Sequence, residues 1–501
     1  MCPCGGPSFL GFAPARKQIA CLCIPGEGKW QVAGKFLARC STLQEMPSTL
    51  PQHTPAKFAA PARGGKLRLL PLVAATYFMV SGGPYGIEDI LGGAGYQRAL
   101  VILLLLPFFW SLPTALMIGE LASAVPAEGG FYVWVRRALG PFWGFQEAWL
   151  SLAASVFDMA IYPTLFVLYL GKLAPTWTAG SRGTLWGLLV VVACSLWNLR
   201  GARAVGDGAV VLCVLLLSPF AVLVGMGFWK GIHGASVWHQ QPASAALSTA
   251  ILVAMWNYMG WDNASTVAQE VEDPQRNYPR AMLMSAAAVA LTYLLPLAAV
   301  AAAGIPPDRF STGSWADAAA TIAGPWLAIA IVAGGLINGF GMFNALMLSY
   351  TRLPLAMAED GMLPRWLGMQ NRRSVPVAAI LVCAVGWALA LGFSFERLIS
   401  IDLILYGGSL LLEFVALIAL RVREPELHRP FSAGSFPVAC LLGVMPAVLL
   451  LFAVYSARGE RMAHMPALVF ALLVACGGPL GYWAARTRQR RQPVSGSPPL
   501  E

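Results

Sequence analysis

Stretches of about 20 mostly apolar residues recur along the chain from Leu69 to Ala485. A helix needs about 20 such residues to cross the hydrocarbon core of a bilayer. Of the 501 residues, 57% are hydrophobic and only 12% are charged, about half the charged share of an ordinary soluble domain. A soluble enzyme of this size needs more polar surface than this chain supplies. We therefore predict an all-α integral membrane protein.

We predict twelve transmembrane helices, because the apolar stretches are separated by short loops. The expected spans are residues 69–95, 98–123, 143–170, 184–200, 208–229, 247–268, 281–304, 325–351, 376–394, 398–420, 437–457 and 465–485.

The net charge of +10 belongs to the two tails. Residues 1–68 hold nine basic and two acidic residues, and residues 486–501 hold four arginines and one glutamate. An excess of Lys and Arg marks the cytoplasmic segments of membrane proteins. We therefore expect both termini in the cytoplasm of a multi-pass plasma-membrane protein, or of an inner-membrane protein in a bacterium, and we expect no nucleic-acid partner.

Residues 1–66 are rich in Pro, Gly and basic residues, so we expect a disordered tail or an over-extended start, with Met46 as the alternative first residue. Their C-x-C pairs lack the spacing of a zinc site, and we predict no metal site. The chain also lacks a G-x-x-x-x-G-K-[ST] loop and a recognisable nucleophile–base pair. We therefore predict no enzyme activity and no cofactor.

Two of the expected spans are interrupted. Gly82, Gly83 and Gly86 flank Pro84 within five residues of the first span, and such a segment cannot continue a regular helix. The sixth span places amides, a glycine and a carboxylate between residues 256 and 263. Unwound backbone at membrane depth is tolerated where it is buried in protein or lines a cavity.

The two breaks occupy the same position in successive sets of five spans, which is typical of inverted repeats with a substrate site between them. We predict a first repeat at residues 67–232, a second at 233–422, two additional helices at 423–486 and a basic tail at 487–501. The alternative is a proline kink and an amphipathic helix in a receptor or channel.

Several carboxylates fall inside or next to these spans. Asp158 and Glu413 lie within apolar runs, and Asp262 lies in the second break. A carboxylate in the membrane is a candidate for binding a cation, carrying a proton or making a structural hydrogen bond. We place Glu88 and Asp89 at the outer mouth as gating candidates. Glu120, near the inner end of span two, is a candidate for coupling, gating or loop anchoring.

Aromatic residues gather at the breaks. At mid-depth such rings suit a cation–π wall around an amine, although Trp and Tyr are also common at membrane interfaces. The candidates for the wall of a substrate site are Tyr85, Tyr162, Trp256, Tyr258 and Trp261.

Several segments together resemble the amino acid–polyamine–organocation transporter superfamily, and within it the polyamine:proton symporter branch. The segments that carry the resemblance are residues 81–89, 158–163, 261–262 with 270–274, 356–364, and 412–414 with 420–426.

The resemblance implies a five-plus-five inverted-repeat core with discontinuous helices 1 and 6, alternating access, and uptake of a small organic cation driven by protons. It implies that Gly82, Gly83 and Gly86 form the break in helix 1, while Trp261 and Asp262 line helix 6. One departure concerns span eight, where this chain has Asn344 in the segment in which the polyamine members carry an extra carboxylate.

That departure keeps a second function open, a proton-coupled permease for neutral or cationic amino acids. A non-transporting sensor or channel on the same scaffold is a third. We prefer protons to sodium as the coupling ion, partly because span eight lacks the tandem Ser/Thr pair of sodium-coupled relatives. The expected partners are the substrate, protons and the lipid bilayer, and a single copy of the chain is expected to suffice.

Overall fold

The computed structural model describes residues 66–234, 236–240, 246–391, 395–459, 461–462 and 465–491. The chain divides into two units, Met1–Pro61 and Ala62–Glu501, and every described residue belongs to the second. The predicted N-terminal tail up to residue 65 and the last ten residues of the basic C-terminal tail lie outside the described residues.

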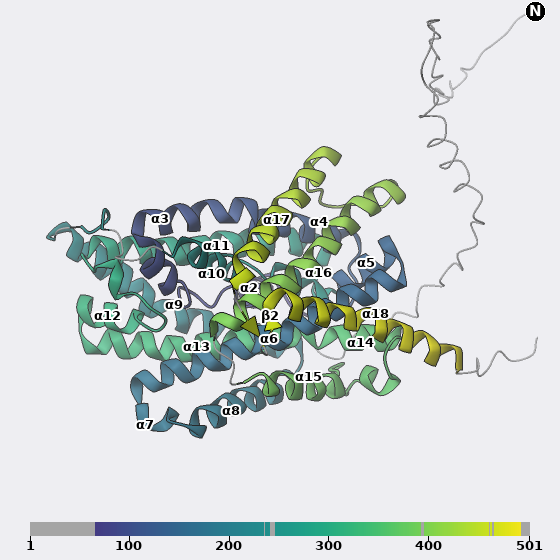
Figure 1. The fold of residues 1–501 in the computed structure, drawn as a ribbon, viewed down its shortest axis with the longest axis horizontal. Helices are drawn as coiled ribbons and strands as arrows, with labels where there is room; N and C mark the ends of the chain where they lie inside the picture. The colour runs from purple at the N-terminus through teal and green to yellow at the C-terminus, as the bar shows by residue number, and fades with distance from the viewer. Residues whose placement is uncertain are drawn as a thin grey trace, which may run out of the picture. The chain divides into compact units, whose positions relative to one another are not determined.

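The described part of the chain is almost entirely helical (Figure 1). Two strands of two residues each, β1 (Arg461–Met462) and β2 (Met465–Pro466), form a small antiparallel hairpin before the last helix. Five short 3-10 helices are η1 (Trp261–Thr266), η2 (Ala268–Glu270), η3 (Pro307–Arg309), η4 (Arg365–Gly368) and η5 (Ala457–Gly459). The α-helices are α2 (Leu69–Val80), α3 (Glu88–Phe109), α4 (Ser111–Ala124), α5 (Phe131–Leu139), α6 (Pro141–Leu173), α7 (Pro175–Thr178), α8 (Ser181–Asn198), α9 (Ala202–Ile232), α10 (Leu247–Asn257), α11 (Pro274–Ala302), α12 (Trp315–Ala323), α13 (Pro325–Tyr350), α14 (Arg352–Glu359), α15 (Val377–Leu389), α16 (Phe395–Arg423), α17 (Phe436–Ser456) and α18 (Ala467–Arg491).

Within the described ranges, eight helical stretches are long and apolar enough to cross a membrane. They are Glu88–Ala124, Pro141–Leu173, Ala202–Ile232, Pro274–Ala302, Pro325–Glu359, Leu398–Arg423, Phe436–Gly459 and Ala467–Gln489, and two shorter apolar helices are α2 and α15. Large apolar side chains on α9 and α17, such as Val214 and Leu451, are exposed. Such a surface needs lipid around it, so the predicted all-α membrane class is confirmed.

The predicted boundary between the first two spans, at residues 95–98, falls at a kink in the structure. The backbone of Gly95 is non-helical, with φ 71° and ψ 168°, so two helices meet across a kink within the apolar stretch Glu88–Ala124. The predicted spans 184–200 and 247–268 correspond to α8, which has 18 residues, and to α10 followed by η1. The twelve-span count stays a prediction.

Both of the predicted breaks interrupt helical structure. Helix α2 ends at Val80 and α3 begins at Glu88, while α10 ends at Asn257 and η1 begins at Trp261. Gly83, Gly86 and Gly260 have φ values of 80°, 91° and 91°, a backbone conformation that other residues rarely adopt.

The two interrupted segments touch one another. A Cβ atom on residue 260 would lie 2.4 Å from the carbonyl oxygen of Met79, at the end of α2. The Asn257 side-chain amide donates to the carbonyl of Gly86 at 3.3 Å. Glycine at position 260 is therefore required both by its φ value and by the close approach of α2.

Helix α6 packs against α13 and α16 (Figure 1). Glycines on α13 allow the first of these contacts to be close: a Cβ atom at Gly335 would lie 2.4 Å from the ring of Tyr169, and one at Gly339 would lie 2.6 Å from the carbonyl oxygen of Tyr162. Small residues of this kind let membrane helices approach backbone to backbone.

We expect Gly339→Ala to destabilise the protein, because its methyl group would meet backbone atoms of α6 that cannot move aside independently. Overpacking of this kind costs about 1–3 kcal/mol. The melting temperature of the detergent-solubilised protein, followed by size-exclusion chromatography, measures the effect. The matched control is Gly386→Ala on α15, where a Cβ atom meets nothing within 4 Å. Equal melting temperatures for the two variants would contradict the packing described here.

Candidate cation-binding site

Asp158 on α6 is surrounded by aromatic side chains. Its carboxylate is 3% exposed and accepts hydrogen bonds from the hydroxyls of Tyr162, at 2.5 Å, and Tyr350, at 3.3 Å. The indole of Trp256 interacts with the same carboxyl group and stacks on Tyr162 with ring centroids 6.3 Å apart. The structure therefore brings together three of the predicted site residues, Asp158 and Tyr162 from α6 and Trp256 from the end of α10.

Asp262 is held by a tyrosine that the sequence analysis did not select. The hydroxyl of Tyr406 on α16 donates to Asp262 Oδ1 at 2.6 Å and accepts from the backbone N–H of Gly260 at 3.0 Å. One side chain thus fixes both the carboxylate and Gly260, the left-handed glycine that precedes η1. Asp262 is 2% exposed.

Asp402 is a third carboxylate in this region, and sequence reasoning missed it. Its side chain is completely buried on α16, and neither of its oxygens has a hydrogen-bond partner among the described residues. It interacts electrostatically with Asp158 and Asp262. The signal was present in the sequence, because Asp402 lies one helical turn before Tyr406 inside an apolar span.

These three carboxylates have no basic partner in the part of the chain that the structure describes. The ion pairs found there involve other acidic residues. Buried carboxylates without counter-charges are costly in an apolar environment. The arrangement is therefore complementary to a ligand that supplies positive charge, and the aromatic rings beside Asp158 favour an ammonium group.

Glu88 and Asp89, the acidic residues after the first break, make hydrogen bonds away from Asp158 and Asp262. Glu88 accepts from the hydroxyl of Tyr169 at 2.6 Å and from the backbone N–H groups of Gly86, at 2.6 Å, and Gly313, at 3.2 Å. Asp89 accepts from the backbone N–H and the hydroxyl of Thr312, at 2.9 and 2.6 Å. Both carboxylates thus tie the first break to the loop before α12, and neither contacts Asp158 or Asp262.

Other predicted site residues support the backbone of the breaks. The hydroxyl of Tyr85 donates to the carbonyl of Ile331 at 2.5 Å, and that of Tyr258 donates to Leu103 at 2.8 Å. The indole N–H of Trp261 donates to the carbonyl of Tyr258 at 2.9 Å.

The first-break glycines lie close to other helices. A Cβ atom at Gly82 would lie 1.4 Å from the amide oxygen of Asn338 on α13, and one at Gly86 would lie 3.1 Å from the ring of Trp256. Gly83 lies beside the side chain of Leu216 on α9. Gly86 is therefore the one of the three that lies against the wall of the Asp158 site.

Asn344 joins two helices. Its side-chain oxygen and its carbonyl accept from the amide of Asn198 on α8, at 2.8 and 3.1 Å. Glu413, on α16, is completely buried and has no hydrogen-bond partner among the described residues.

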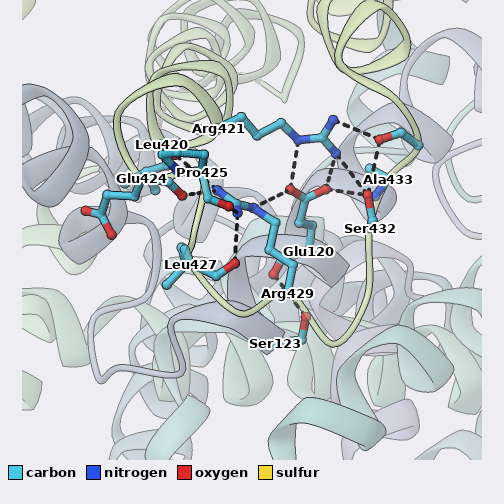
Figure 2. Close-up of polar contacts among 11 residues, drawn as sticks. Glu120, Ser123, Leu420, Arg421, Glu424, Pro425, Leu427, Arg429, Ser432 and Ala433 are labelled. Atoms are coloured by element: carbon cyan, nitrogen blue, oxygen red, sulfur yellow. Dashed lines mark hydrogen bonds and ion pairs between the residues drawn. The ribbon is translucent and has the colours of Figure 1, made fainter. Parts of the chain in front are cut away.

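Glu120 lies near the C-terminal end of α4 in a network of charged groups (Figure 2). Arg421 binds both of its carboxylate oxygens, Arg429 approaches to 3.3 Å, and the backbone N–H of Ala433 donates at 2.8 Å. These partners hold the loop between α16 and α17 against α4. Of the three predicted roles, the contacts favour loop anchoring.

A second charged cluster was missed by sequence reasoning. Arg352, completely buried at the start of α14, donates two hydrogen bonds to Glu270 Oε1, at 3.0 and 2.8 Å. Glu128 lies nearby in the loop between α4 and α5, where burial raises the pKa of its carboxyl to about 7. The Arg352 guanidinium opposes this pKa rise, and the charges of Glu270 and Glu359 add to it.

Residues 73–475 match the family model described as "Amino acid permease". The chain is 36% identical over 410 residues to "Polyamine transporter PUT1" of Oryza sativa subsp. japonica, covering 80% of this chain and 76% of that protein. It is 33% identical over 415 residues to "Polyamine transporter RMV1" of Arabidopsis thaliana, covering 82% and 84%. It is 27% identical over 401 residues to "Large neutral amino acids transporter small subunit 2" of Homo sapiens, covering 74% and 71%.

We expect Glu120→Ala to lower stability by about 3–5 kcal/mol, because it leaves two largely buried guanidinium groups without their carboxylate. The control is Glu424→Ala. Glu424 pairs with Arg137 and is more exposed than Glu120, so its removal is expected to cost about 1 kcal/mol or less. The melting temperatures of the two variants in detergent check the difference. An equal loss in both would contradict the anchoring role of Glu120.

We expect the stability advantage of Glu128→Gln over the wild type to grow as pH rises from about 4.5 to about 7. The pKa of Glu128 is raised in the folded state, so the folded protein holds this proton more tightly than the unfolded chain. The wild type therefore loses stability as pH rises through this window, by about 1–3 kcal/mol, whereas the glutamine variant does not. Melting temperatures measured across the window test this, with the exposed Glu272→Gln as the control. Parallel pH profiles for Glu128→Gln and the wild type would contradict it.

Proposed function

Because the chain belongs to the amino acid permease family, we propose that it is a secondary active transporter that takes up polyamines or related organic cations together with protons. The observation that carries the proposal is the set of buried carboxylates Asp158, Asp262 and Asp402, none of which has a basic partner among the described residues. The relatives named polyamine transporters match most of this chain and most of their own length, which supports the same substrate class.

A diamine has an ammonium group at each end and no carboxylate, so it needs an acidic partner at both ends. Asp158 and Asp262 are the proposed partners, since both belong to the region where the two helix breaks meet. Tyr162 and Trp256 form the aromatic wall next to Asp158. Asp402 adds a third negative charge, which offsets the absence of a carboxylate at Asn344.

We further propose twelve spans, with the inverted repeats at residues 67–232 and 233–422 and with discontinuous helices at the two glycine breaks. The direct contact between Gly260 and Met79 supports this arrangement, because a substrate site between two repeats requires their breaks to be neighbours. The positive tails support cytoplasmic termini in the plasma membrane. Alternating access would then expose the site to one side of the membrane at a time.

A proton-coupled amino acid permease is the second candidate. An amino acid would place its carboxylate against free N–H groups of the first break and its ammonium group against carbonyls of both breaks. The similarity to a human protein named as a transporter of large neutral amino acids supports this reading.

We expect Asp158→Asn and Asp262→Asn each to reduce putrescine uptake by about tenfold or more, because a hydrogen bond to a charged group contributes about 1.5–3 kcal/mol. Uptake of radiolabelled putrescine is measured in proteoliposomes with an inward proton gradient, with unlabelled spermidine, arginine and leucine as competitors. The matched control is Asp207→Asn, which changes a partly exposed aspartate at the start of α9.

Unchanged putrescine uptake in both variants would contradict the carboxylate site. Uptake of leucine or arginine without putrescine would favour the amino acid permease. Flux that does not saturate would indicate a channel, and uptake that stops when sodium is removed at fixed pH would contradict proton coupling.

A further inference from the structure

Helices α6 and α16 carry mirrored pairs of glutamate and serine. Glu147 precedes Ser151 by four residues on α6, and Ser409 precedes Glu413 by four residues on α16. A spacing of four residues places both members of a pair on one face of a helix, one turn apart. Neither Glu147 nor either serine was selected from the sequence.

The two helices run antiparallel and bring these pairs together. The hydroxyls of Ser151 and Ser409 lie 2.7 Å apart, and Arg423 at the end of α16 donates to the carbonyl of Ala138, just before α6. One turn from the serines toward that end, Glu413 is therefore opposite Glu147. The two carboxyl groups interact electrostatically.

Glu147 Oε1 and the hydroxyl oxygens of Ser151 and Ser409 form a triangle, and the protons available for its three contacts can be counted. Glu147 Oε1 lies 3.0 Å from the hydroxyl of Ser151 and 2.9 Å from that of Ser409, and the third side is the 2.7 Å contact between the hydroxyls. Two serines supply two protons for three contacts. The third proton is present only when the Glu147 carboxyl group is protonated, and one contact lacks a hydrogen when it is ionised.

The surroundings of Glu147 and Glu413 favour a bound proton. Both side chains are completely buried, and both Glu413 oxygens and Glu147 Oε2 lack hydrogen-bond partners among the described residues. The ionisable groups that face them are Asp262 from η1, Tyr406 from α16 and Tyr132 from α5. No ion pair joins either glutamate to a basic residue in the described ranges, so two full negative charges here would be uncompensated.

We propose that Glu147 and Glu413 form a proton-binding site, distinct from the amine-binding carboxylates Asp158 and Asp262, that carries the coupling proton. The proton lies on Glu147, where it completes the hydrogen-bond ring with Ser151 and Ser409, and the electrostatic interaction with Glu413 favours its retention. An ammonium group does not fit this ring, because it would have to separate hydroxyls that already touch. This inference rests on the proposed function.

The test compares gradient-driven accumulation of putrescine with putrescine exchange in the absence of a proton gradient, in proteoliposomes that also report proton co-flux by a pH-sensitive dye. In Glu147→Gln and Glu413→Gln, an amide replaces the group that holds the proton. We expect the ratio of accumulation to exchange to fall by about tenfold or more, with loss of proton co-flux. The matched control, Glu424→Gln just beyond α16, is expected to keep the wild-type ratio.

If Glu147→Gln does not yield folded protein, Glu413→Gln carries the test, because its side chain makes no hydrogen bond among the described residues. A wild-type ratio and co-flux in the glutamine variants would overturn the proton site. A changed preference between putrescine and spermidine with intact co-flux would also overturn it, because that result assigns the glutamates to substrate binding. Absence of putrescine exchange in the wild type would instead overturn the proposed function, and this inference with it.

Discussion

Uncompensated negative charge inside an apolar helical protein is the constraint on which the rest of this structure depends. Asp158, Asp262 and Asp402 are buried without basic partners among the described residues, and their charge is costly unless a ligand or a proton neutralises it. The surrounding structure limits that cost through the tyrosine hydroxyls that donate to Asp158 and Asp262. Binding of a cation next to these carboxylates would therefore stabilise the protein by offsetting their buried charge.

The acidic residues Glu120 and Glu270 are instead paired with basic residues. Glu120 pairs with two arginines and Glu270 with one, and these ion pairs connect segments that are far apart in sequence. Removing one partner leaves a buried charge, so such pairs hold one arrangement of the loops in preference to others. The molecule thus separates carboxylates that stabilise the fold from carboxylates that remain available to a ligand or a proton.

The two helix breaks connect these parts. Gly260 contacts the end of α2, and Tyr406 binds both the backbone of Gly260 and the carboxylate of Asp262. Movement of α16 relative to the breaks would therefore change the surroundings of Asp262, as well as those of Glu413 on the same helix. Under the proposed function, this link would give substrate binding and protonation a common structural element.

The sequence by itself determined the all-helical membrane class, the positions of both breaks and the candidacy of Asp158, Asp262 and Glu413, because apolar length, glycine clusters and carboxylates in apolar runs are local features. It did not separate Glu88, Asp89 and Glu120 from these, since a carboxylate looks the same along the chain whether it meets an arginine, a backbone N–H or nothing. It also did not select Asp402, Glu147 or Tyr406. Only the tertiary structure decided which charges are paired, because the partners lie far apart in sequence, by 82 residues for Glu270 and Arg352 and by 301 for Glu120 and Arg421, and the cost of a buried charge depends on them.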